Sequence, residues 1–383
     1  MKKDAQNIEA PSVSTALEKL IRGAIARGDG WLPFDRFMAM ALYAPGLGYY
    51  ARSDRQFGSL PSSSKNKSPD GNGSDFITAP ELSPLFGAAL AQQVRQALDG
   101  CDSAQVWEFG AGSGALALQL LNALGDQVQV YTIVELSAAL RERQRASLAA
   151  FADKVQWVDA LPELMQGVVV GNEVLDAMPV QLLHFDGSTW AEMGVTWRDE
   201  KFQWSGRATD LKPPASNVAF PPDSVTEIHS QAEAFIATLG ERLQRGAAFF
   251  IDYGFPEAEY YHPQRHMGTL MCHHQHQADG NPLVMVGNKD ITAHINFTGI
   301  AVAAQAAGLD ILGYTSQARF LMNCGVMTLL EGADIKTIAN TQKLLTEHEM
   351  GELFKVIAFA KGCKPSFTTA PIGFAVGDRT HTL

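Results

Sequence analysis

The sequence predicts an α/β protein whose mostly parallel sheet carries helices on both faces. From Ala104 onward, short apolar segments with strand character alternate with helical segments, which is the pattern of a parallel sheet with crossover helices. A glycine-rich turn, Gly110 to Gly114, joins the first strand to the first helix, and polar side chains follow several strands. At 383 residues the chain exceeds the usual single domain of roughly 100 to 200 residues, so insertions or a second domain are expected.

The elements of this sheet follow from the spacing of apolar residues. Apolar runs of about four to eight residues bounded by polar or glycine residues indicate buried strands, and longer runs with helical spacing indicate helices. Ser137 precedes one such helical run and can cap it. The predicted strands are residues 104–109, 128–134, 155–158, 167–173 and 247–254, with a late strand at 354–362, and the predicted helices are residues 115–124, 137–151 and 297–310.

The rest of the chain is expected to add to this sheet. Alternating hydrophobic residues at 181–197 and 201–206 indicate antiparallel hairpin strands in an insertion, and the stretch from Phe255 to Asn296 is predicted to be irregular. The polar Gly, Pro and Ser composition of residues 58–74 predicts a flexible loop. The predicted parts are an N-terminal helical segment (1–100), the main domain (101–179 and 246–362), an inserted substrate or lid region (180–245) and a C-terminal tail (363–383).

Composition excludes several classes of function. The net charge of −11 disfavours a surface that binds many phosphates, so no nucleic-acid partner is expected. Since no apolar run approaches the roughly 18 to 20 residues that cross a bilayer, no membrane span is expected either. The cysteines have no C-x-x-C spacing and predict free thiols in a cytoplasmic protein, or an organellar one if a targeting peptide is missing from the chain. These cysteines are Cys101, Cys272, Cys324 and Cys363.

Cofactor binding is predicted at the carboxyl ends of the first three strands, where ligands of open parallel sheets bind. Gly110, Gly112 and Gly114 fit a turn that holds S-adenosylmethionine, but Gly110, Gly112 and Ala115 fit the dinucleotide turn equally well. Glu135, about 20 residues further on, can accept hydrogen bonds from ribose hydroxyls in either cofactor. The glycine motif therefore leaves both cofactors open.

Further polar residues follow the third, fourth and fifth strands. Asp159 can take the exocyclic amine of adenine, or serve as a helix cap or a solvated loop residue. Asn172, Glu173 and Asp176 crowd the end of the fourth strand, where Glu173 is expected to contact substrate and Asp176 is equally well explained as a cap. Asp252 ends the fifth strand, facing the same crevice or binding a loop backbone.

Several motifs together resemble the MidA-like family of class I S-adenosylmethionine-dependent methyltransferases. These are "WEFGAGSGALALQLL", "YTIVELSAALRERQ", "VVGNEVLDAMPVQLL", "FIDYGFPEAEYYHPQRHMGTLMCHHQH" and "DITAHINFTGI", with "GYY" and "DFITAPELSPLFG" before them. The family includes a mitochondrial complex I assembly factor that methylates arginine. The resemblance implies a Rossmann-like methyltransferase sheet, transfer of a methyl group to a protein arginine, and cofactor contacts at Glu108, Gly110, Gly112, Gly114 and Glu135.

Methyl transfer from a sulfonium needs alignment and exclusion of water, with no metal or covalent nucleophile. Carboxylates can hold a guanidinium in a bidentate manner, and Glu173 and Asp252 are the candidates, with Asn172 assisting. The expected partner is a protein that presents an arginine, and a homodimer is compatible with the sequence. A catalytically silent assembly protein and an NAD-dependent oxidoreductase are the alternatives.

A cluster in the second irregular stretch raises the question of a metal site. Cys272, His273, His274 and His276 lie close in sequence, but adjacent histidines seldom converge on one ion, and no second spaced pair is present. We therefore predict no metal. His294 is expected to be a hydrogen-bonded structural histidine, with a role as general base as the alternative.

Overall fold

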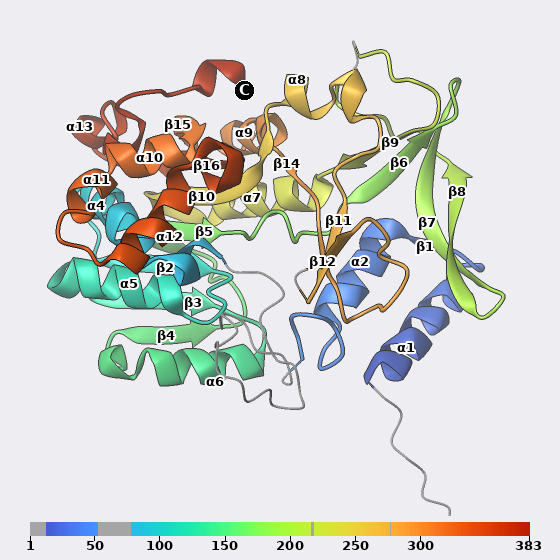
Figure 1. Ribbon diagram of the computed structural model, residues 1–383, viewed down its shortest axis with the longest axis horizontal. Coiled ribbons are helices and arrows are strands. Elements are labelled where there is room, and N and C mark those ends of the chain that lie inside the picture. Colours follow the sequence, from blue (N-terminus) through green and yellow to red (C-terminus); the bar gives the residue numbers. More distant parts are fainter. Residues whose placement is uncertain (1–12, 53–77, 216–217, 276) are drawn as a thin grey trace, which may run out of the picture.

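The computed structural model describes residues 13–52, 78–215, 218–275 and 277–383. The predicted flexible loop at 58–74 lies outside the described residues, as does His276. In the described part, a large mixed sheet with helices on both faces stands beside a smaller unit built around the N-terminal helices (Figure 1). This arrangement confirms the α/β prediction.

The large sheet has the order β15-β16-β10-β5-β2-β3-β4, with the short β14 pairing to β10. The pairs from β10 to β4 are parallel, whereas β16 runs antiparallel to both β10 and β15. The strand at β15 was not among the predicted strands. The strands are β2 (Gln105–Phe109), β3 (Val130–Val134), β4 (Val155–Val158), β5 (Met165–Asn172), β10 (Leu243–Phe255), β14 (Ile295–Asn296), β15 (Asp310–Ser316) and β16 (Phe354–Lys361).

Both faces of the central strands are buried, which explains their continuous apolar sequence. In β5, Val168 and Val170 pack on one face while Val169 packs on the other, and β10 alternates in the same way at Phe249 and Phe250. Helices from both sides of the sheet cover these residues (Figure 1). They are α4 (Pro84–Gly100), α5 (Ala115–Leu124), α10 (Gln317–Asn323), α11 (Val326–Leu329) and α12 (Ile335–Leu345) with the first core cluster, and α7 (Ser230–Arg242) and α9 (Phe297–Ala306) with the second.

The smaller unit joins the start of the chain to the segment that follows β5. Its five-stranded sheet has the order β1-β7-β6-β9, with β8 on β7, and Leu32 pairs with Val195. Leu17, Phe37 and Leu182 belong to its separate core. The elements are α1 (Val13–Arg27), α2 (Phe34–Tyr43), β1 (Leu32–Pro33), β6 (Gln181–Phe185), β7 (Trp190–Arg198), β8 (Lys201–Ala208) and β9 (Ser224–Ile228).

The stretch from Phe255 to Asn296, predicted to be irregular, contains a small sheet of order β12-β11-β13. Its strands are too short for a periodic signal, but Cys272 and Ile291 pair across it and are buried in the core of the smaller unit. The strands are β11 (Met271–His274), β12 (Gln277–Asp279) and β13 (Asp290–Thr292), and the remaining short helices of the molecule are α3 (Ala79–Leu82), α6 (Ala138–Ser147), α8 (Glu257–Tyr260) and α13 (Pro365–Thr368).

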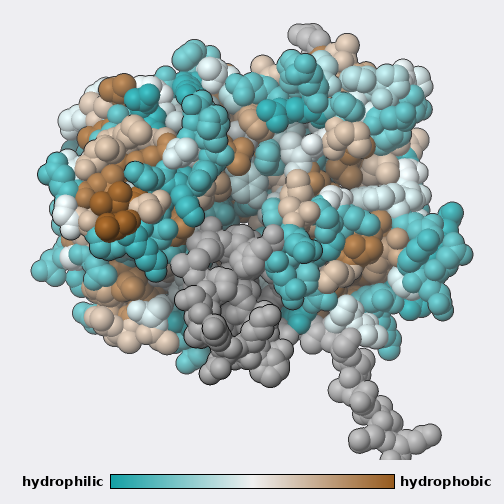
Figure 2. All heavy atoms as spheres, viewed as in Figure 1, coloured by the Kyte–Doolittle hydropathy of each residue, from teal (hydrophilic) through white to brown (hydrophobic). Residues whose placement is uncertain are grey.

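The surface in Figure 2 mixes hydrophilic and hydrophobic side chains over the visible face. Within the described ranges, no helix combines the length and the apolar character needed to cross a bilayer.

The prediction of four free thiols is wrong for Cys101 and Cys363, which form a disulfide with their Cα atoms 4.4 Å apart. Cys101 follows α4, and the chain returns beside it after β16, where Lys364 N donates to Gly100 O at 2.8 Å. Because the pair is 262 residues apart in sequence, only the tertiary fold brings it together. Cys272 and Cys324 are free and buried.

Thiol titration of the unfolded protein is expected to find two thiols without reductant and four after reduction, because one disulfide joins two of the four cysteines. Ellman's reagent in denaturant measures this directly. A Cys363→Ser variant is the control and should titrate as three thiols without reductant. Four thiols in the unreduced wild type would contradict the bond.

Candidate functional site

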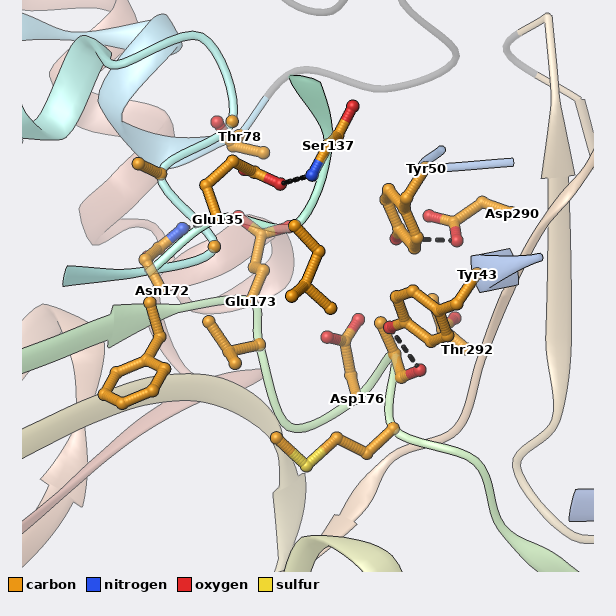
Figure 3. A pocket seen from close by; sticks show the side chains of 18 of the residues that line it. Tyr43, Tyr50, Thr78, Glu135, Ser137, Asn172, Glu173, Asp176, Asp290 and Thr292 are labelled. Carbon is orange, nitrogen blue, oxygen red and sulfur yellow. Dashed lines mark hydrogen bonds between the residues drawn. The ribbon is translucent and has the colours of Figure 1, made fainter. Parts of the chain in front are cut away.

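A cavity of about 1920 Å³ opens at the carboxyl ends of β2, β3 and β5. The large sheet supplies one side of it, and α2 and β13 of the smaller unit supply another (Figure 3). This is the edge where the parallel strands present the residues that follow them, so the cavity lies where the sequence predicts ligand binding.

The glycine turn after β2 forms part of the cavity wall. Gly110, Gly112 and Gly114 have φ of 63°, 52° and 84°, a left-handed conformation that glycine adopts without strain. A Cβ atom on Gly112 would meet no atom within 4 Å, so that position faces open space. Gly110 and Gly112 line the cavity, while Gly114 lies behind them at the N-cap of α5.

Glu108 and Glu135 end β2 and β3 at the same edge, and both line the cavity. Glu108 is 2% exposed and accepts a hydrogen bond from Tyr131 Oη at 2.7 Å. Burial, with a smaller contribution from Glu135, raises the pKa of Glu108 to about 8. Glu135 accepts from Ser137 N at 2.8 Å and from Gln144 Nε2 at 3.3 Å, and burial raises its pKa.

Asp159 differs from these two acids. It follows β4, is exposed, and does not line the cavity. The preceding residue, Val158, accepts a hydrogen bond from Glu135 N at 3.0 Å, and the contact of Asp159 with adenine stays a prediction.

The turn after β5 directs three polar side chains into the cavity. Glu173 has φ of +54°, an uncommon conformation for a residue with a Cβ atom, and its N–H donates to Ile251 O at 2.9 Å. Asn172 Nδ2 donates to Glu173 Oε1 at 2.9 Å. Asn172 Oδ1 and Asp176 Oδ1 are buried without a hydrogen-bond partner among the described residues. Buried polar atoms usually have partners, so these two atoms indicate a missing ligand or water.

The acids of this turn hold protons unusually tightly. Burial and the neighbouring Asp176 raise the pKa of Glu173 to about 8. Burial also raises the pKa of Asp176 to about 6, although Tyr253 Oη donates a hydrogen bond to it. A cation that enters the cavity would favour the charged form of both carboxyls.

Asp252, predicted to end a strand, lies three residues before the end of β10 and does not line the cavity. Its Oδ2 accepts hydrogen bonds from the backbone N–H groups of Val174, Leu175 and Asp176, at 3.1, 2.9 and 3.3 Å. Burial, followed by Asp176 and Glu173, raises its pKa well above the usual range. This carboxyl holds the turn that carries Glu173, and it corresponds to the loop-binding alternative for this residue.

The opposite side of the cavity contains residues that the sequence did not single out. Tyr43 Oη donates to Ala177 O at 2.9 Å, and Tyr50 Oη donates to Asp290 Oδ1 at 2.7 Å. The two rings stack with centroids 5.5 Å apart. Tyr50 and Asp290 belong to "GYY" and "DITAHINF", so the resemblance contained a signal for them.

Of the His-rich segment, His273 lines the cavity. His274 Nδ1 lies 2.8 Å from Asn288 O, and Cys272 is buried in the small sheet. His294 lines the cavity, and burial lowers its pKa to about 4, so the ring is neutral. Over the described ranges, no three His, Cys, Asp or Glu side chains gather as a metal site would need.

The charge of the cavity wall discriminates between the two candidate cofactors. Seven carboxyl groups line it, and of the described residues no lysine or arginine does. Such a wall disfavours binding of the negatively charged pyrophosphate of a dinucleotide. It favours binding of the positively charged sulfonium and ammonium groups of S-adenosylmethionine. The open space at Gly112, the acid at the end of β3 and the unpartnered Asn172 Oδ1 also fit that cofactor. The lining acids are Asp35, Glu81, Glu108, Glu135, Glu173, Asp176 and Asp290.

Comparisons with known proteins agree with this chemistry. A family model described as "Putative S-adenosyl-L-methionine-dependent methyltransferase" matches residues 85–315. A solved protein from Burkholderia thailandensis bound to S-adenosylhomocysteine is 47% identical, with a TM-score of 0.89, and the match covers 98% of this chain and 99% of that one.

Curated relatives are more distant. The Caenorhabditis elegans homolog of the mitochondrial protein arginine methyltransferase NDUFAF7 is 26% identical, over 83% of this chain and 78% of its own length. The human mitochondrial protein arginine methyltransferase NDUFAF7 is 24% identical, over 87% and 80%. The matched family model spans more than half of the chain and agrees with the resemblance in the motifs. The protein is a S-adenosylmethionine-dependent methyltransferase and belongs to this MidA-like family.

Proposed function

We propose that this methyltransferase transfers the methyl group to the guanidinium of an arginine in a protein substrate. The observation that carries the proposal is the acidic wall, in which Glu173 and the 4% exposed Asp176 lie beside the cofactor-binding strand ends. A guanidinium is a planar cation with five N–H donors and no acceptor, so it can use carboxylates on more than one side. The relatives named as protein arginine methyltransferases support the same class of substrate.

Cofactor binding is proposed at the strand ends on the large sheet. Gly110 and Gly112 would allow close approach of the cofactor to the turn, with Gly114 at the start of α5 keeping the turn in its left-handed conformation. Glu135 would accept hydrogen bonds from the ribose hydroxyls, and Glu108 would face the methionine end. Asp159 stays a weaker proposal for the adenine amine, because the exposed side chain would have to move to reach it. When bound, the cofactor supplies an electrophilic methyl carbon.

The residues of the β5 turn hold and orient the nucleophile. Glu173 and Asp176 accept hydrogen bonds from the guanidinium, Asn172 Oδ1 accepts a further one, and one nitrogen stays directed toward the methyl carbon. Asp252 acts as a positioning residue, since it fixes the backbone that carries these side chains. Formation of the N–C bond would break the bond between the methyl carbon and the cofactor sulfur and leave S-adenosylhomocysteine, and Glu173 would receive the proton that the nitrogen gives up.

A methyl-transfer assay tests the proposed function. Purified protein and S-adenosylmethionine with a labelled methyl group are incubated with an extract, and the labelled protein is hydrolysed to amino acids. Label in methylarginine is the expected result. Label in another amino acid would overturn the arginine assignment, and cofactor binding without any transfer would favour the assembly-protein alternative.

Methyl transfer to arginine is expected to rise with pH between about 6 and about 8, the pKa values of Asp176 and Glu173. Arginine stays protonated over this range, so the substrate itself does not titrate, and the charged forms of Asp176 and Glu173 bind the cation. Because kcat/KM reports on the free enzyme, the acid limb of its pH profile should reflect the raised pKa values of these two carboxyls. Initial rates from about pH 5.5 to about pH 9 measure it. A rate that falls with rising pH over this range would contradict the assignment.

The target protein and its compartment are proposed by analogy. Two relatives carry the word mitochondrial in their names, and a subunit of a respiratory complex is the substrate type that the resemblance implies. For this chain, a cytoplasmic location and a homodimer stay predictions.

A further inference from the structure

The cavity has an aromatic wall that the methyltransferase sheet does not provide. It consists of Tyr43 at the end of α2, Tyr50 and Asp290 on β13. Tyr43 and Tyr50 precede the matched region of the family model, which begins at residue 85. The smaller unit therefore adds these side chains to a cofactor-binding sheet.

The wall is held rigidly in place. Its two rings stack at an interplanar angle of 23°, and each hydroxyl is anchored, that of Tyr43 on Ala177 O and that of Tyr50 on Asp290. Tyr49 packs behind Tyr50 at 5.0 Å and is 1% exposed. A ring whose hydroxyl is fixed presents a defined face, and binding to such a face costs little conformational entropy.

The wall faces the acids of the β5 turn. In Figure 3, Tyr43, Tyr50 and Asp290 lie on one side of the cavity and Glu173 lies on the other, with Asp176 between them near Tyr43. The two sides are close enough to interact electrostatically, because Asp290 contributes to the raised pKa of Glu173 and Asp176 contributes to that of Tyr43. The space between the two sides therefore has a carboxyl group on each side, and one of the sides also presents an aromatic ring.

We propose that the wall of Tyr43, Tyr50 and Asp290 selects the guanidinium of arginine over the ammonium of lysine. The planar guanidinium lies between this wall and Glu173, with Asp176 beside it. It is weakly hydrated and stacks on aromatic faces while its N–H groups reach carboxylates in its plane. A lysine ammonium is compact and strongly hydrated, and its three N–H groups do not match this flat space. This inference rests on the proposed arginine methylation and adds the part of the site that determines its specificity.

Equilibrium binding tests the wall without turnover. Nα-acetyl-arginine methylamide and the corresponding lysine amide are titrated by NMR into the full chain saturated with S-adenosylhomocysteine. The wild type is expected to prefer the arginine probe. Tyr43→Leu, which removes the aromatic face, and Asp290→Asn should each weaken arginine binding by about 2- to 30-fold and leave lysine binding unchanged. Tyr43→Phe keeps the face and should retain most of the preference.

Folding is monitored through the affinity for S-adenosylhomocysteine, which should not change in any variant. Tyr314→Phe is the matched control, because Tyr314 Oη is buried without a partner in the described part of the chain and does not line the cavity. If the wild type prefers arginine and both Tyr43→Leu and Asp290→Asn keep the full preference, the wall is not the selector, although the proposed function stands. If the wild type does not prefer the arginine probe, the inference and the arginine assignment both fail.

Discussion

Gly112→Val is expected to lower methyl transfer by weakening cofactor binding. Gly112 lines the cavity at φ of +52°, and an added Cβ would enter open space that the cofactor needs. The branched side chain also cannot adopt this conformation without strain. A steric cost of about 1 to 3 kcal/mol corresponds to a roughly 5- to 150-fold loss of affinity. Calorimetric titration with S-adenosylhomocysteine measures it.

Gly308→Val separates the lost cofactor site from general backbone strain. Gly308 also has positive φ, at +76°, and an added Cβ would likewise meet no atom within 4 Å, but it follows α9 away from the cavity. Both variants should lose similar thermal stability, while only Gly112→Val should lose affinity. Normal cofactor binding by Gly112→Val would refute the placement of the cofactor at this turn.

Glu173→Gln is expected to lower kcat/KM for an arginine substrate while cofactor affinity stays the same. The amide keeps the shape and can still accept from Asn172 Nδ2, but it cannot neutralise a guanidinium or receive its proton. Loss of one partner of a buried charge pair costs about 2 to 5 kcal/mol, or roughly 30- to 5,000-fold. Steady-state rates with an arginine peptide give the ratio of kcat/KM between wild type and variant.

Protein stability should not explain this loss. The pKa of Glu173 is raised in the folded state to about 8, so its contribution to stability is present at low pH and is lost as the pH rises from the unfolded value near 4.5 to about 8. Removal of this carboxyl is therefore not expected to lower the free energy of unfolding at pH 8. Glu331→Gln, at an exposed position, is the matched control. Wild-type kcat/KM in Glu173→Gln would contradict the proposed role.

The parallel sheet and its cofactor edge are predictable because their signals are local. Strand β2, the turn at Gly110 and helix α5 follow one another within 20 residues, each with its own apolar or glycine pattern. The sequence thus predicts that Glu108 and Glu135 lie at one edge, and both line the same cavity. Their contacts with a cofactor stay predictions.

The side chains that depend on tertiary contacts were less predictable. A carboxyl near a strand end can face the cavity or bind the backbone of a neighbouring turn, and the sequence does not distinguish the two cases. Glu173 lines the cavity, whereas Asp252 accepts hydrogen bonds from the backbone of the turn after β5. Tyr50 and Asp290 come together on one wall of the cavity from distant parts of the chain, as Cys101 and Cys363 do elsewhere in the fold. No periodic pattern encodes such pairs.

The smaller unit combines residues from the start of the chain with residues that are synthesised much later. This determines when its contacts can form during synthesis. Leu32 cannot pair until Val195 has been synthesised, and Tyr50 cannot donate its hydrogen bond until Asp290 has been synthesised. Closure of such long loops is entropically costly, and non-local pairings form slowly. The glycine turn is synthesised early. The cavity that it lines therefore stays incomplete until β13 has left the ribosome.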